Sequence, residues 1–482
     1  MPLILPGNVG SATAATGFNV DNSLRFNGGS SDYLNRTNAT PTNQLIWTYS
    51  FWVKLSDITD AQGSGNQMLL SDFGSASNRG TIFFESDDTL TISDRVSNSF
   101  TFKYVTTRLF RDVSAWYHIV INHNRTLSTP VTKVFVNGVQ ETSFSTSTNP
   151  SQNGTSYFNV DGQASYVGKY GGGSEYYNGY LAEAVWIDGQ ALDADQFGEF
   201  DEDSGIWKPI DVSGLTFGDN GFYLDFEDSG ALGADVSGNT NNFTVNNLTA
   251  IDQSTDTCTN NFATMNPLDN FWQGFAFSDG NTTVTTTNAS QSYSTSSIMV
   301  SSGKWYVECK PVSGGSEPEI GVAIKMVGVN AGNNAQLSYN ANGYGYRASD
   351  PGTVWYNGTA VSTGFSQYAN GDIIGIALDL DNNKLYFSKN GTFGNSGDPT
   401  SGATGTGAIS IVAPTSTTLG AYAFAMNETF NDQNKVFSWN FGNPAFAISS
   451  GNTDGNDRGN FEYAPPSGYL SLCTANLSEV LG

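Results

Sequence analysis

The sequence predicts an all-β protein: two antiparallel β-sandwich (jelly-roll) domains joined by an ordered Asn/Thr-rich connector. Nine Asn-Gly pairs punctuate the 482 residues, and both residues of such a pair tolerate the positive φ that a type I′ hairpin turn requires. Short runs that are apolar or alternate apolar with polar lie between these turns, as expected for antiparallel strands. Helical patterning is scarce, so sheets must supply the core.

Individual strands are predicted from the runs that fit this pattern. They are Thr48–Ser56, Thr81–Ser86, Trp116–Asn122, Thr132–Gly138, Ile320–Met326 and Lys435–Gly442. The segment Gly371–Gly391 predicts a complete hairpin, because two apolar runs flank the polar turn Asp381–Lys384. One helix of about three turns is predicted at Ala191–Glu202, where apolar residues recur on one side.

Composition divides the chain into three predicted regions. Residues 1–210 carry regular strands and the predicted helix. Residues 211–295 are rich in Asn, Thr and Asp, yet aromatic residues recur along them and need a core. We therefore expect an ordered connector with short strands there, because disordered segments are poor in aromatic residues. Residues 296–482 form a second strand-rich block.

The formal net charge is −25. Nucleic-acid binding is not expected, since proteins neutralise phosphates with clustered Lys and Arg. Membrane insertion is not expected either, because no run approaches 18 apolar residues. Three cysteines and two histidines are too few and too scattered for a disulfide framework or a zinc site.

Five segments of the first region follow one another in a recognisable order. They are Ser23–Leu34, Trp47–Asp57, Ala115–Thr126, Thr132–Gln140 and Ser165–Phe197. Together they resemble the strand series of a laminin-G or concanavalin A-like lectin sandwich of the pentraxin-related kind. Each segment alone is weakly specific, and the ordered set of five is strongly so.

Five segments of the last region form a second ordered set. They are Gly303–Glu308, Glu319–Ile324, Gly343–Arg347, Gly371–Gly391 and Trp439–Phe446. Together they resemble a SPRY domain. The resemblance implies a bent β-sandwich with Gly371–Gly391 as its central hairpin. It also implies a binding module whose specificity comes from loops at one end, with no catalysis.

Two further segments, Asn220–Asn270 and the ending Ala464–Leu477, resemble structural proteins of tailed bacteriophages, notably marine ones. In that group, lectin-like and SPRY-like sandwiches recur side by side in virion appendages. The sequence departs from the group at Cys258, where proline is expected, and at its end, which reads Leu-Ser-Glu-Val. The match is therefore to a loose mosaic group.

A calcium site is predicted in the loop Gly233–Asn242, which resembles an Asp-x-Ser-Gly-Asn-x-Asn loop of lectin-like domains. Asp235, Asn239 and Asn241 offer the oxygen donors that Ca²⁺ prefers, and Gly238 permits the turn. The alternative is a network of Asx turns with no metal.

Aromatic residues near loops indicate carbohydrate contact, since flat rings stack on sugars. The candidates are Tyr170, Tyr176 and Tyr177 around Gly171–Tyr180, and Trp355 and Tyr356 in the second block. Two alternatives stay open: these residues pack their own hairpins, or they face a neighbouring subunit.

Catalysis is not expected. Asp225 and Glu227 are spaced to share one face of a possible strand, as are Asp379 and Asp381, and paired carboxylates can hydrolyse glycosides. Neither pair completes the three-carboxylate pattern of laminarinase-like enzymes. The simpler interpretation is that these pairs are structural carboxylates at the ends of loops.

The preferred function is that of a bacteriophage virion protein, a tail fibre or similar appendage that binds a host-surface polysaccharide. The alternatives are a capsid-decoration or head-fibre protein with a purely structural role and, last, a glycan hydrolase. We expect a homo-oligomer, a trimer by preference, in contact with other virion proteins, because repeated weak sites gain avidity. The expected location is the virion, after synthesis in the host cytoplasm and release by lysis.

Overall fold

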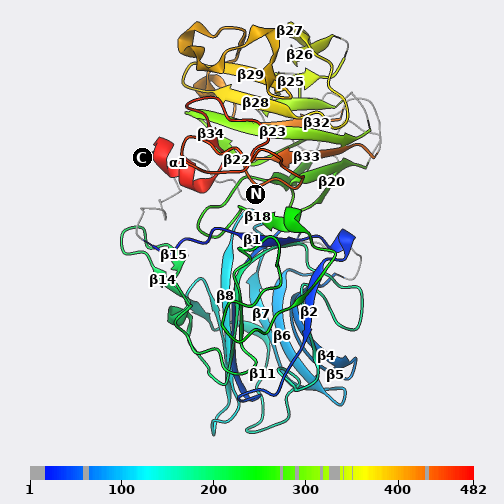
Figure 1. The fold of residues 1–482 in the computed structure, drawn as a ribbon, viewed down its shortest axis with the longest axis vertical. Helices are drawn as coiled ribbons and strands as arrows, with labels where there is room; N and C mark the ends of the chain where they lie inside the picture. The colour runs from blue at the N-terminus through cyan, green and yellow to red at the C-terminus, as the bar shows by residue number, and fades with distance from the viewer. Residues whose placement is uncertain are drawn as a thin grey trace. The chain divides into compact units, whose positions relative to one another are not determined.

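The computed structural model describes residues 17–57, 65–271, 275–287, 293–314, 318–324, 337–339, 341–349, 351–428 and 434–481. The described residues divide into two compact units, 17–259 (the first unit) and 260–481 (the second unit). Each unit has its own hydrophobic core between two sheets (Figure 1). The predicted all-β class is confirmed, because nearly every strand pair is antiparallel.

One sheet of the first unit is called the covered sheet. In spatial order its described strands are β10 (Val139–Glu141), β9 (Val131–Val136), β8 (Tyr117–Asn124), β3 (Ile46–Leu55), β13 (Gly179–Asp188), β1 (Ser23–Phe26) and β18 (Gln253–Ser254), with β16 (Phe222–Leu224) paired to β13. Every residue of β13 is buried. A strand buried on both faces needs a layer on each side of its sheet.

The other sheet of the first unit is called the open sheet. In spatial order its described strands are β11 (Phe144–Thr148), β7 (Ser99–Leu109), β6 (Thr89–Val96), β5 (Asn78–Phe84), β4 (Gln67–Ser75), β12 (Ala164–Val167), β2 (Tyr33–Thr37) and β17 (Thr244–Asn246). Alternation along β12 buries Ser165 and Val167 and leaves Tyr166 partly exposed. The open sheet therefore has an outer face that can meet a partner.

The outer face of the covered sheet is buried by the chain after β13. Ala194, Phe197 and Val212 pack there against Val185 and Ile187 of β13. The predicted helix at 191–202 is wrong: this stretch contains a single 3₁₀ turn, η2 (Ala194–Gln196), and then strand β14 (Gly198–Phe200), which pairs with β15 (Trp207–Pro209). Ala194 and Phe197 are buried against the sheet. This burial overrides a weak helical propensity that Gly198 interrupts.

The stretch 211–295, expected as a connector, supplies strands to both units. β16, β17 and β18 belong to the first unit, and β19 (Met265–Phe271), β20 (Phe275–Ser278) and β21 (Thr283–Thr286) belong to the second. The boundary between the compact units lies at Asn260. Phe222 and Phe243 are buried in the core of the first unit, which explains why aromatic residues recur along this polar stretch.

The second unit pairs two sheets in its described residues. One contains, in spatial order, β19, β22 (Tyr293–Val300), β32 (Tyr422–Asn427), β24 (Glu319–Ala323), β25 (Gly343–Arg347), β26 (Gly352–Tyr356) and β27 (Thr359–Phe365). The other contains β20, β21, β33 (Val436–Asn440), β23 (Lys304–Ser313), β28 (Ile374–Asp379), β29 (Lys384–Lys389) and β30 (Thr392–Phe393), with β31 (Ile409–Ser410) paired to β29 and β34 (Leu470–Ser471) to β23.

The hairpin predicted at 371–391 is confirmed as β28 and β29, which pair from Ile374 with Lys389 to Asp379 with Lys384. Helices are short: beside the 3₁₀ turns η1 (Gly28–Ser30), η3 (Ala250–Asp252), η5 (Gly394–Ser396), η6 (Pro399–Thr404) and η7 (Pro414–Ser416), one α-helix, α1 (Thr474–Leu481), lies near the end of the described chain. None of the helices in the described residues has the length and apolar character needed to cross a bilayer.

A buried ion pair attaches the last segment of the first unit to its sandwich. Lys54 of β3 lies 2.6 Å from Asp256, and both side chains are buried. Trp116 donates its indole N–H to the same carboxylate at 3.0 Å. Removing one partner of such a pair leaves an uncompensated charge in the interior.

We expect Asp256→Ala to lower the free energy of unfolding of the first unit by about 3–5 kcal/mol. Lys133→Ala, which breaks the exposed pair with Asp193, should cost less than about 1 kcal/mol. Urea unfolding followed by tryptophan fluorescence measures both. Equal losses in the two variants would contradict the role assigned to Asp256.

Candidate functional site

A short hairpin lies over the outer face of the open sheet. It is closed by a bridge between Lys169 and Tyr176 and by a hydrogen bond from the Tyr170 N–H to the Glu175 carbonyl at 2.8 Å. A Cβ at Gly171 would lie 2.4 Å from Phe73 of β4. Glycine is therefore needed where this hairpin presses onto the sheet.

At one end of the outer face near this hairpin, Lys169 is surrounded by tyrosine rings. The Lys169 Nζ lies 4.2 Å from the ring centroid of Tyr33, 5.6 Å from that of Tyr176 and 5.8 Å from that of Tyr166. All four side chains are partly exposed. Within the described residues, Lys169 makes no ion pair with a carboxylate. The rings stabilise its charge by cation–π attraction and still present faces to solvent.

The region continues across the neighbouring strands. Tyr170 packs edge-on against Phe73, with centroids 5.3 Å apart, and the Arg79 guanidinium lies 5.5 Å from the Tyr170 ring. Arg95 lies 4.4 Å from the ring of Phe100, which is 43% exposed. We call this surface the aromatic strip: it comprises Tyr33, Phe73, Phe100, Tyr166, Tyr170 and Tyr176 with Arg79, Arg95 and Lys169.

The structure separates the predicted carbohydrate residues. Tyr170 and Tyr176 lie in the aromatic strip. Tyr177 is fully buried, and its hydroxyl donates to the Lys54 carbonyl at 2.8 Å, so it offers no face to a ligand. Burial also raises the pKa of Tyr177 well above its ordinary value.

Trp355 and Tyr356 belong to the second unit and lie on opposite faces of β26, as consecutive strand residues must. Tyr356 stacks on the buried Tyr344, with centroids 4.3 Å apart. Trp355 lies beneath the Arg347 guanidinium at 4.9 Å. These two residues therefore form neither a common platform nor a part of the aromatic strip.

Seven members of the aromatic strip were not predicted from the sequence alone, although strand alternation holds the signal for two of them. Tyr33 and Tyr166 each stand between buried neighbours, so period two places both outside. That β12 pairs with both β2 and β4 could not be read from the chain, because these strands are distant in sequence. Arg79, Arg95 and Lys169 carry no local pattern.

The three predicted calcium ligands are used to hold their own loop together. Asp235 accepts hydrogen bonds from the N–H groups of Tyr223, Ser237 and Asn241 at 2.7–3.0 Å. Asn239 and Asn241 both donate to the Gly221 carbonyl. Within the described residues, no group of three His, Cys, Asp or Glu side chains is placed to hold a metal. Asn239 and Asn241 use their amide nitrogens for these bonds, and the calcium site at this loop stays a prediction.

The carboxylate pairs considered for hydrolysis are also structural. β16 ends at Leu224, and Phe226 has a φ of +60°, so Asp225 and Glu227 do not share a strand face. Asp379 accepts from Asn382 and pairs with Lys304 at 3.2 Å, which stabilises the central turn. Asp381 accepts from the Gly303 N–H at 2.8 Å.

His118 is held as a neutral side chain in the covered sheet. Its Nδ1 accepts from the Trp207 indole N–H at 2.8 Å, so its Nε2–H donates to the Ser50 hydroxyl at 2.9 Å. Its ring stacks on Trp52, with centroids 4.6 Å apart. Burial lowers the pKa of His118 to about 3. Burial lowers the pKa of His123 well below its ordinary value, and the charge of Arg125 lowers this pKa further.

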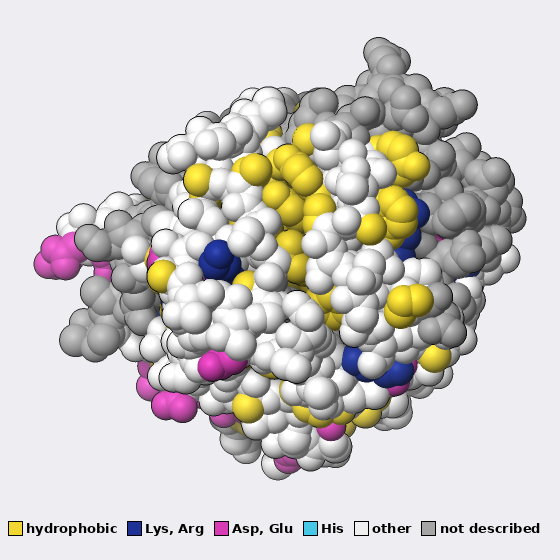
Figure 2. Space-filling model, turned by 90° about the horizontal axis from the view of Figure 1, so that it is seen from above, with side chains coloured by type: hydrophobic (Ala, Val, Ile, Leu, Met, Phe, Trp, Pro, Cys, Tyr) yellow, Lys and Arg dark blue, Asp and Glu magenta, His cyan; other side chains and the backbone are white. Residues whose placement is uncertain are grey.

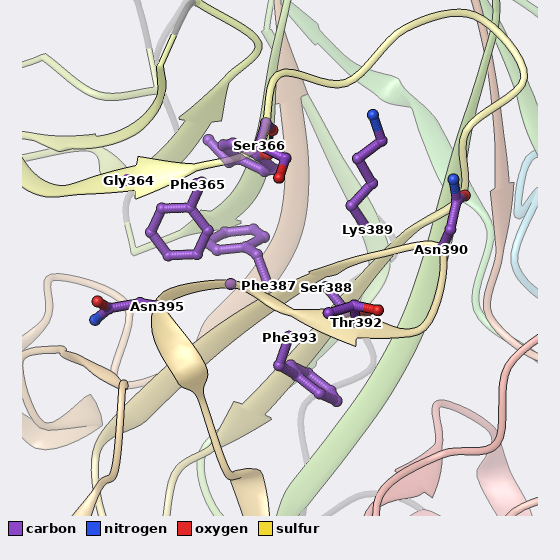
Figure 3. A pocket seen from close by; sticks show the side chains of 12 residues that line it. Gly364, Phe365, Ser366, Phe387, Ser388, Lys389, Asn390, Thr392, Phe393 and Asn395 are labelled. Carbon is purple, nitrogen blue, oxygen red and sulfur yellow. Dashed lines mark hydrogen bonds between the residues drawn. The ribbon is translucent and has the colours of Figure 1, made fainter.

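The second unit contains a pocket of about 450 Å³, within the size range of small-ligand sites. Its lining is partly aromatic: Tyr346, Phe365 and Phe387 pack with ring centroids 5.3–6.3 Å apart. Figure 3 shows the rings of Phe365 and Phe387 beside each other. In the face that Figure 2 shows, hydrophobic side chains gather in a hollow surrounded mainly by backbone and uncharged residues. Two polar groups at the rim are engaged within the protein: Lys389 pairs with Asp372 at 2.9 Å, and Asn390 donates to it.

Two family models match the chain in these units. Residues 27–196 match the concanavalin A-like lectin/glucanases superfamily, and residues 303–413 match the SPRY domain. The chain thus carries a lectin-like domain followed by a SPRY domain. The lectin-like and SPRY resemblances drawn from the sequence are confirmed, and the resemblance to bacteriophage structural proteins stays a prediction.

Individual proteins match parts of the chain. Ran-binding protein 9 from Danio rerio is 31% identical over 94 residues, which are 20% of this chain and 15% of that protein. The SPRY domain of human HERC1 is 18% identical and covers 36% of this chain and 96% of its own (TM-score 0.27). A heptameric SAP-like pentraxin from Limulus polyphemus is 18% identical and covers 37% and 80% (TM-score 0.28). The chain spans less than a fifth of the Ran-binding relative.

Acid should destabilise the first unit through His118. Its pKa is lower in the folded protein than in the unfolded chain, so the unfolded chain binds the proton first and stability falls as pH drops from about 6.5. Between pH 7 and pH 4.5, titration of His118 should lower the free energy of unfolding by about 3 kcal/mol.

His118→Gln keeps an acceptor for Trp207 and removes the titration. Urea unfolding of both proteins at the two pH values isolates the difference. Parallel losses in wild type and variant would show that His118 does not titrate as inferred.

Proposed function

We propose that this protein is a structural component of a tailed-bacteriophage virion, an appendage such as a tail fibre, whose first unit binds a host-surface polysaccharide. The aromatic strip is the observation that supports glycan binding. It places partly exposed tyrosine faces side by side on a lectin-like sandwich, on the sheet whose outer face is not buried by the chain after β13. The bacteriophage assignment is supported by the sequence resemblance of Asn220–Asn270 and Ala464–Leu477.

Tyrosine suits sugar binding for two physical reasons. The apolar face of a pyranose ring loses water when it stacks on an aromatic ring, and the phenol hydroxyl can exchange hydrogen bonds with sugar hydroxyls. Tyr166 and Tyr176 both flank Tyr33, with centroids 6.1 and 6.4 Å from it. A ligand lying along the strip can therefore contact several rings at once.

Attachment to a cell would come from many copies. One shallow aromatic site binds weakly, and linked sites raise avidity through effective concentration. We propose a homo-oligomer, a trimer by preference, assembled with other virion proteins and located in the virion. Calcium remains a prediction, and no step of this binding depends on it.

Tyr166→Ala and Tyr176→Ala should each weaken binding to intact host cells about tenfold, because a lost aromatic contact costs on the order of 1.4 kcal/mol. Binding of fluorescently labelled oligomer, with competition by isolated surface polysaccharide, measures this. The assay is run with calcium and then with EDTA, so that loss of binding in EDTA would reveal a metal requirement.

Tyr339→Ala provides the matched control, since it removes a tyrosine that is 37% exposed in the second unit. Its binding should equal that of wild type. If folded wild-type oligomer binds no host cell, a purely structural virion role replaces the adhesion role.

A further inference from the structure

Two arginines stand directly opposite each other on the outer face of the open sheet. Arg79 of β5 and Arg95 of β6 are register partners in an antiparallel pair with no irregularity. Like charges in directly opposed positions destabilise a sheet. An arrangement that opposes folding in this way needs another reason to exist.

In the part of the chain that the structure describes, neither arginine forms an ion pair. Within the described residues no carboxylate lies within ion-pair distance of either guanidinium, although Arg108, Arg111 and Arg125 of the same unit all pair with acids. The chain has 45 acidic residues against 20 basic ones. Shortage of carboxylates therefore does not explain two unpaired neighbours.

Most donors of this pair have no acceptor in the described residues. A guanidinium has five N–H donors. Arg79 gives one hydrogen bond, to the Ala76 carbonyl, and Arg95 gives one weak bond of 3.4 Å to the Asn98 side chain. The Nε of Arg95 is buried and has no partner there. The aromatic rings of Tyr170 and Phe100 lie 5.5 and 4.4 Å from the two guanidiniums and limit their motion.

We propose that Arg79 and Arg95 bind a negatively charged group of the glycan, so that the ligand is an acidic polysaccharide. This inference rests on the proposed function and adds the chemical class of its ligand. Planar guanidiniums recognise carboxylate, sulfate and phosphate oxygens through paired hydrogen bonds. Phe73, the register partner of Arg79 on β4, connects the arginines to the rest of the aromatic strip.

Two acidic features oppose this binding. Glu175 lies close enough to influence Tyr170, although it forms no ion pair with either arginine in the described residues. The net charge of −25 repels anions at long range. At physiological salt that repulsion is screened beyond about 8 Å, whereas direct hydrogen-bonded contact is not. Recognition is therefore expected to be local and to require both arginines.

The first test uses inorganic sulfate at constant ionic strength, with thermal unfolding of the first unit as the readout. Sulfate should stabilise wild type with a saturable increment above its general salting effect, and the variant Arg79→Gln/Arg95→Gln should lose that increment. Arg108→Gln/Arg111→Gln removes the same two positive charges from surface ion pairs of the same unit and should behave like wild type. Equal stabilisation of all three proteins would overturn the proposal.

The second test compares matched polymers: oligogalacturonate with its carboxyl-reduced form, and dextran sulfate with dextran. Acidic forms should bind at least about tenfold more tightly than their neutral counterparts, and the double arginine variant should lose that preference. The carboxylate and sulfate arms distinguish the two kinds of anion.

The outcomes separate this inference from the proposed function. If acidic and neutral polymers bind alike and only Tyr166→Ala weakens them, glycan binding stands and the acidic ligand is overturned. If sulfate binds at the arginines but no acidic polymer does, the site holds a free anion and the acidic polysaccharide is again overturned.

Discussion

Both units depend on buried carboxylates that each accept hydrogen bonds from several N–H groups. Asp188, at the end of β13, accepts from the backbone of Thr42, Asn43 and Asn220 and from the side chain of Asn159. Four segments distant in sequence meet at this one group. Irregular chain that is buried must find partners for its backbone groups, and a charged acceptor serves several at once.

The same device fixes the end of the second unit. Glu308 of β23 accepts from the backbone N–H groups of Glu462 and Tyr463 and from the Asn440 side chain. Asp454 accepts from Ser471 and Asn476. Irregular segments are thereby held on the sheets with few regular elements of their own. In the first unit, chain of this kind buries the outer face of one sheet, and the aromatic strip occupies the outer face of the other.

Sequence reasoning succeeded where structure is local. The hairpin at 371–391 follows from alternation and turn chemistry within one short segment, and β28 and β29 form there. It failed at 191–202, because the fate of Phe197 depends on a sheet face that no local pattern reveals. The stretch 211–295 showed that its aromatic residues need a core, and their partners on β13 and β2 are remote in sequence.

The candidate site shows the same limit. Tyr170 and Tyr176 were found because they crowd into one loop. Their neighbours on β2 and β4 come together through β12, which pairs with both strands although it is distant from them in sequence. Arg79 and Arg95 lie on consecutive strands, and their opposition depends on the register of that pair of strands. Tyr177 illustrates the converse, since adjacency to the partly exposed Tyr176 says little about a side chain that alternation turns inward.

Gly171 and Gly172, in the hairpin over the open sheet, are positions where a substitution would change the outer surface. A Cβ at Gly171 or Gly172 would lie within 2.5 Å of Phe73, so any other residue must lift the hairpin away from the sheet. A single base change in either codon would therefore change the shape of this outer surface, while the cores between the sheets stay unchanged. Such a substitution would change the surface proposed to bind a ligand, and it would cost packing of the hairpin against Phe73.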